Sequence, residues 1–86
     1  MSVVAVVCTV ESTLPADVYE REPYEVFLAE QVNTRRVIEK LGATVVKWLG
    51  RTTYPSYGSA HKWAIECDEV ALTALTLVCK SVTLLE

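Results

Sequence analysis

The sequence predicts an α+β fold with the element order strand, helix, strand, strand, helix, strand. Three observations carry this prediction. Residues 3–10 are mainly β-branched and contain no polar residue larger than Thr9, which is typical of a strand. The segment between Pro23 and Gly42 has the apolar spacing of a helix. Residues 43–67 hold two apolar segments on either side of a stretch rich in turn residues, which indicates a hairpin.

Size and composition restrict the chain to one small folded unit. It has 86 residues, of which 51% are hydrophobic and 22% are charged, so we expect a single ordered domain over 1–86. No apolar run approaches the length of about 18–20 residues that a membrane helix needs. The first ten residues lack the basic flank of a signal peptide. We therefore expect a cytoplasmic protein without a membrane segment.

The first predicted strand and the first predicted helix each have one unusual feature. Both faces of strand 3–10 are apolar, so we expect it to be central and covered on both sides. A loop with one possible helical turn after Pro15 leads to a helix over 23–41, which begins at Pro23 and ends at a left-handed Gly42. Polar residues interrupt its apolar stripe, so its middle either lines a wet cleft or carries long side chains past the core edge. The apolar members of that stripe are Tyr24, Phe27, Leu28, Ile38 and Leu41, and the polar ones are Gln31, Thr34 and Arg35.

The hairpin is expected to consist of strands 43–49 and 59–67 joined by a loop over 50–58. Lys47, Lys62 and Glu66 mark the solvent-facing side, because side chains alternate along a strand. The same alternation predicts the core-facing residues, which are Val46, Trp48, Trp63, Ile65 and Cys67.

The C-terminal part is predicted to be a helix followed by a short strand. Asp68 suits the N-cap of a helix over 69–80, whose apolar residues share one stripe. Thr73 and Thr76 leave a strand reading of this segment open, because threonine favours strands. Residues 82–85 are then the last strand.

This element order resembles the ferredoxin-like superfold, a βαββαβ chain that forms a four-stranded antiparallel sheet with two helices on one face. The resemblance implies a fold and no particular function, since such folds host many activities. A metal-binding branch of this fold has a C-x-x-C motif after strand one, and an RNA-binding branch has aromatic residues on its inner strands. Neither signature occurs here.

The three cysteines do not indicate a metal site or a disulfide framework. Cys8, Cys67 and Cys79 are odd in number and widely spaced, which is typical of buried free thiols. Together with His61 they would suffice for zinc by ligand count, but the paired short spacings of zinc motifs are missing. We expect no metal and no cofactor.

Candidate binding residues gather around the hairpin. Aromatic and cationic side chains lie close together there, as in surfaces that bind proteins or planar anions. Since the two tryptophans are assigned to the core, the recognition surface reduces to Arg51, Tyr54 and Tyr57 on the loop, with His61 beside it. Gln31 and Arg35 are further candidates on the first helix.

These residues favour a small oligomeric binding domain that recognises a protein or a small anionic or aromatic ligand through the hairpin loop. No catalytic motif occurs. The alternative is a small dimeric ferredoxin-like enzyme with a pocket between the sheet and helix one, lined by Gln31, Arg35 and His61. A third reading, single-stranded nucleic-acid binding, fits aromatics beside cations but conflicts with the net charge of −3.

The expected partner is a second copy of the chain. Two helices can cover only one face of the sheet, so the apolar residues of the other face need a different cover. We expect a homodimer through this open face, with Lys47, Lys62 and Glu66 at its rim. The apolar residues assigned to this face are Val3, Ala5, Val7, Val45, Leu49 and Ala64.

Overall fold

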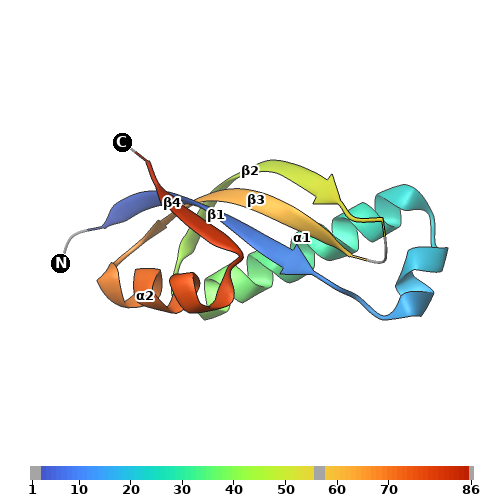
Figure 1. The fold of residues 1–86 in the computed structure, drawn as a ribbon, viewed down its shortest axis with the longest axis horizontal. Helices are drawn as coiled ribbons and strands as arrows, with labels where there is room; N and C mark the ends of the chain where they lie inside the picture. Colours follow the sequence, from blue (N-terminus) through green and yellow to red (C-terminus); the bar gives the residue numbers. More distant parts are fainter. Residues whose placement is uncertain (1–2, 56–57, 86) are drawn as a thin grey trace.

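Four strands and two α-helices follow one another in the predicted order in the computed structural model, which describes residues 3–55 and 58–85 (Figure 1). A short 3-10 helix after Pro15 is the predicted helical turn. Across the described residues no helix is long and apolar enough to cross a membrane. The elements are β1 (Val4–Ser12), η1 (Ala16–Glu20), α1 (Pro23–Lys40), β2 (Thr44–Thr53), β3 (Ser59–Cys67), α2 (Glu69–Val78) and β4 (Ser81–Leu84).

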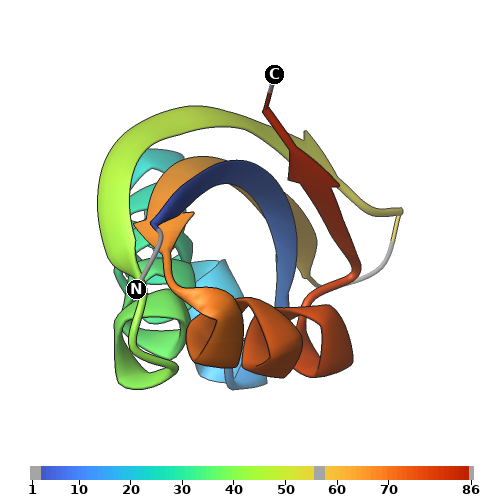
Figure 2. The ribbon, with the colours of Figure 1, turned by 90° about the vertical axis from the view of Figure 1, so that its left-hand side faces the viewer.

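The four strands form one antiparallel sheet in the order β2-β3-β1-β4. Viewed along its length, the sheet curves over α1 and α2, which both lie beneath one of its faces (Figure 2). The predicted βαββαβ plan with two helices on one face is confirmed, and the strand order is the one expected for a ferredoxin-like chain. β1 is central, as its apolar character predicts, while β2 and β4 are the edge strands.

The core lies between the sheet and the two helices. Along β1 the residues Val6, Cys8 and Val10 are buried, whereas their neighbours face the open side. Ile38 of α1 and Leu75 of α2 meet them from the helical layer, and both are fully buried.

Local chemistry marks the end of α1 and the start of α2. Gly42 has a φ of +92°, so it provides the left-handed turn after α1. The Asp68 carboxylate accepts a hydrogen bond of 2.8 Å from the Ala71 N–H and caps α2. α2 ends at Val78 rather than at 80, because Cys79 is already extended. The strand reading of this segment is wrong, and β4 begins at Ser81, one residue earlier than predicted.

β2 corrects two predictions about the hairpin. It extends to Thr53, so Arg51 belongs to the strand and the connection covers only 54–58. Its pairing with β3 shifts between Val45 and Lys47 and again between Trp48 and Gly50, as in β-bulges. Each shift reverses the alternation of side chains. Val45 therefore packs on the core and not on the open face, while Val46 is 57% exposed and not a core residue.

The buried stripe of α1 is rotated relative to the predicted one. Tyr24 and Leu28 are exposed, although the sequence placed them toward the core. Since residues four apart share one face of a helix, the buried set marks the true inward stripe. Its fully or nearly fully buried members are Val26, Glu30, Thr34 and Ile38.

Candidate functional site

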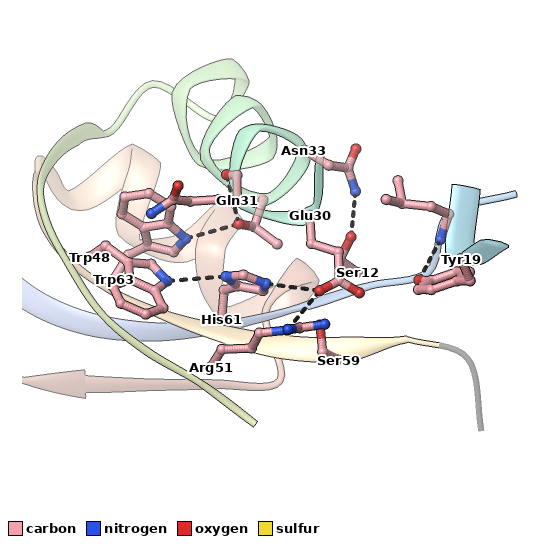
Figure 3. A network of polar contacts seen from close by, with 12 residues as sticks. Ser12, Tyr19, Glu30, Gln31, Asn33, Trp48, Arg51, Ser59, His61 and Trp63 are labelled. Atoms are coloured by element: carbon pink, nitrogen blue, oxygen red, sulfur yellow. Dashed lines mark hydrogen bonds and ion pairs between the residues drawn. The ribbon is translucent and has the colours of Figure 1, made fainter. Parts of the chain in front are cut away.

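A buried ion cluster lies between α1 and β3, where an apolar core would be expected (Figure 3). The Glu30 side chain and the His61 side chain are both 0% exposed, and the Arg51 side chain is 24% exposed. Arg51 Nε lies 2.9 Å from Glu30 Oε1, and His61 Nε2 lies 3.3 Å from the same oxygen. One carboxylate oxygen therefore joins two strands to the helix, since Arg51 is on β2 and His61 on β3.

The tautomer of His61 follows from its two neighbours. The indole N–H of Trp48 donates to His61 Nδ1 over 3.1 Å, so Nδ1 carries no proton. The neutral ring must then hold its proton on Nε2, which donates to Glu30 (Figure 3). Burial lowers the pKa of His61 below its ordinary value of 6.5, although the Glu30 carboxylate acts in the opposite direction. Both ring nitrogens are thus engaged, and neither is free to act as a base toward a substrate.

One oxygen of the cluster is left without a partner. Glu30 Oε2 is buried and accepts no hydrogen bond from any residue that the structure describes. The remaining polar groups around it are paired with one another: Asn33 donates to Ser12 Oγ over 3.0 Å, and Arg51 Nε lies 3.4 Å from Ser59 Oγ. The charge of Glu30 is therefore balanced through Oε1 alone.

Next to this cluster an open groove of about 340 Å³ runs between α1 and the edge strand β2. Gln31 and Arg35 line it from the helix, and Lys47 lines it from the strand. The middle of α1 thus lines a cleft, which is one of the two readings that its polar interruption allowed. The apolar part of the lining consists of Val32, Val45, Val46, Trp48 and Trp63.

Trp48 connects the groove to the buried cluster. Its indole N–H is held by His61, and its ring meets Phe27 edge to face at 5.1 Å between ring centroids. Arg51 lies over the Phe27 ring at 5.8 Å. The cluster therefore fixes the orientation of the aromatic residue that forms part of the groove wall.

The other candidate on the hairpin, Tyr54, is part of a separate surface contact. Its hydroxyl donates to Glu11 Oε2 over 3.0 Å and accepts from Lys80 Nζ over 3.2 Å. The hydrogen bond between Lys80 and Tyr54 and the nearby Glu11 charge raise the pKa of Lys80. Tyr54 therefore ties the hairpin to β1 and to the start of β4. Tyr57 lies outside the described residues.

The five predicted site residues that the structure describes separate into three places. Arg51 and His61 meet in the buried cluster, Gln31 and Arg35 meet in the groove, and Tyr54 lies apart from both. The expectation that Arg51 is presented on an exposed loop is wrong, because its guanidinium is turned to Glu30. Sequence reasoning missed Glu30, although its spacing of four from Val26 and eight from Ile38 is a signal for the buried stripe.

Neither a metal site nor a similarity to known proteins identifies the function of this site. Within residues 3–55 and 58–85, no group of three or more His, Cys, Asp or Glu side chains is placed to hold a metal ion. Comparisons with family models, with curated proteins and with solved structures find no match to this chain. The function must therefore be inferred from the side chains themselves.

Proposed function

We propose that this chain is a non-enzymatic binding domain that takes a small anionic ligand with a flat apolar body in the groove between α1 and β2. The observation that carries the proposal is the meeting of cations and an aromatic wall in one groove. Arg35 of α1 and Lys47 of β2 both line this groove, together with Trp48. Such a lining suits a ligand that is charged at one end and planar at the other.

The two cations are available to a ligand. Arg35 contacts Glu39 at 3.6 Å, but both side chains are more than half exposed, so this pair is weak. Lys47 is exposed, and no hydrogen bond or ion pair holds it within the described part of the chain. The Gln31 amide adds a donor and an acceptor at the same place.

The wall of the groove is held in place before a ligand arrives. Trp48 is fixed by His61, and His61 by Glu30, which Arg51 holds in turn. A rigid aromatic surface lowers the entropic cost of binding, because fewer rotamers are lost. This gives the buried cluster a positioning role in binding.

A matched pair of probes tests the proposal. We expect 2-naphthoate to bind and to shift the amide resonances of Arg35 and Lys47, whereas uncharged 2-naphthamide binds at least about tenfold more weakly. The double variant R35Q/K47Q should lose the preference for the carboxylate. R36Q, a matched change at an exposed position of the same helix, should keep it. Equal binding of both probes, or shifts confined to other residues, would contradict the proposal.

A second candidate function, self-association, is favoured by the uncovered face of the sheet. Ala5, Val7 and Ala64 lie on the side away from the helices, and the bulged Leu49 beside them is 43% exposed. Val45 is not part of this face, so the patch is smaller than the sequence predicts. We propose that a second copy of the chain covers it, sheet against sheet, as a two-fold dimer.

A further inference from the structure

The cysteine pair Cys8 and Cys79 is a feature that the binding site does not use. Cys8 is fully buried on β1, and Cys79 is half-buried directly after α2. Cys79 packs against the core cluster that contains Cys8, and the interaction with Cys79 raises the pKa of the Cys8 thiol. The adjoining backbone is also joined, because the Lys80 N–H donates to the Thr9 carbonyl over 2.8 Å. Two thiols that are 71 positions apart in sequence therefore meet.

We propose that Cys79 and Cys8 form an oxidation site, in which Cys79 reacts with a peroxide and Cys8 then closes an intramolecular disulfide. Redox-sensing cysteines are typically accessible and lie next to a second, resolving cysteine, and Cys79 and Cys8 have this arrangement. Cys67 is the third thiol of the chain, and at 4% exposure it lacks this access.

The ionisation of the thiols supports the order of the two roles. Cys79 is half-buried whereas Cys8 is fully buried, and the interaction with Cys8 lowers the pKa of Cys79, so the more accessible sulfur is the one that becomes the thiolate. The interaction with Cys79 and burial raise the pKa of Cys8, which therefore stays a thiol. Burial and the charge of Asp68 raise the pKa of Cys67. The nucleophile is the thiolate, so Cys79 reacts first.

The reaction balances with hydrogen peroxide as the oxidant. The Cys79 thiolate attacks one peroxide oxygen, the O–O bond breaks and hydroxide leaves, so that Cys79 becomes a sulfenic acid. The Cys8 sulfur then attacks the Cys79 sulfur, the S–O bond breaks and the hydroxyl leaves as water with the Cys8 proton. Overall the two thiols lose two electrons and two protons, and peroxide is reduced to two waters.

The product would join β1 to the segment that leads into β4. β4 is an edge strand of four residues that pairs only with β1. A covalent link immediately before this strand restricts its separation from the sheet. Oxidation should therefore raise the thermal midpoint of unfolding, and a thiol reductant should reverse the change.

The experiment uses the reduced wild-type protein and a few equivalents of hydrogen peroxide. We expect the intact mass to fall by about 2 Da, the loss of two hydrogens, and peptide mapping to find the Cys8–Cys79 link. The mass should return after reduction. The matched control C67S should behave in the same way. A link through Cys67, a link between two chains, or a sulfinic acid on Cys79 beside an intact Cys8 thiol would each overturn the proposal.

A second measurement separates the two steps. In C8A the sulfenic acid on Cys79 has no resolving thiol, so dimedone should label Cys79 in this variant more strongly than in the wild type. Native alkylation of the wild type needs no variant and should modify Cys79 at least about tenfold faster than Cys67. Equal rates for the two thiols would contradict the assigned role of Cys79.

Discussion

At the residue scale, the most informative side chain is His61, because its two hydrogen bonds define a protonation state. We expect ¹⁵N chemical shifts of the imidazole to show Nε2 protonated and Nδ1 unprotonated at neutral pH, since Trp48 donates to Nδ1. The chain has one histidine, so the assignment is unambiguous. In W48F the donor is lost and the tautomers should mix. A doubly protonated ring at neutral pH would contradict the hydrogen bonding described.

The lowered pKa of His61 also predicts how stability depends on pH. Below about pH 6.5 the unfolded chain binds a proton that the folded chain does not. The free energy of unfolding should therefore fall as the pH decreases from 6.5 toward the folded pKa, by at most about 1.4 kcal/mol per pH unit. Urea titrations of wild type and H61Q between pH 7.5 and 5 measure this difference. Parallel loss of stability in the two proteins would refute the assignment.

Arg51 and Glu30 should be strongly coupled, since the carboxylate is fully buried. R51M leaves the Glu30 charge without its closest cation and should cost about 3 kcal/mol of unfolding free energy. Adding E30Q removes the carboxylate charge that R51M leaves without a partner. The double variant R51M/E30Q should therefore be more stable than R51M alone. Additive losses in this double-mutant cycle would show that the two residues do not interact.

Sequence reasoning works least well for these residues. Glu30 is charged, and charged side chains are almost never fully buried unless paired, so its position on the buried stripe was not expected. Its partners come from two strands that lie 21 and 31 positions away in the sequence. A local sequence pattern such as helical spacing or strand alternation cannot predict a contact between residues so far apart in the sequence. The candidates His61 and Arg51 were identified by type, but the prediction that Arg51 lies on an exposed loop is wrong.

At the element scale, the starts of both helices and the end of α1 are predictable because they depend on neighbouring residues, whereas α2 ends two residues earlier than predicted. Pro23, Gly42 and Asp68 act as the sequence indicates. Bulges are harder, because an extra residue is tolerated wherever the partner strand allows it. Two of them in β2 exchange the sides of Val45 and Val46, and they place Trp48 and Arg51 on the same side. The groove lining therefore depends on a feature that alternation alone does not reveal.

The N-cap of α2 gives a prediction at this scale. Asp68 accepts a hydrogen bond from the Ala71 N–H at 2.8 Å, so D68A should cost about 1 kcal/mol of unfolding free energy. D68N keeps an acceptor and should retain most of this stability. Thermal and urea unfolding of the two variants measure the difference. If D68A and D68N are equally destabilised, the lost charge near the helix terminus explains the cost, and the cap does not.

At the scale of the whole molecule, the element order determined the fold prediction. An 86-residue chain with this order has few ways to cover a sheet, and both helices do lie on one face. The site was only partly predictable, since the groove lies between α1 and the edge strand β2, which are separate elements in the sequence. Gln31 and Arg35 were found because they interrupt an apolar stripe, whereas Lys47 was read as a solvent-facing marker.

The uncovered sheet face gives the last prediction, a homodimer that persists at high salt. A chain this small buries only about 60–65% of its unfolded surface, and the contact offered by Ala5, Val7 and Ala64 is mainly apolar. V7E should dissociate the dimer, because it places a charge in the middle of the contact. L77E is the matched control, since Leu77 is 83% exposed on α2 and lies away from this face. Sedimentation at about 100 µM decides the matter. A wild-type monomer there means an association weaker than roughly −5 kcal/mol, and the face would then have to bind another partner.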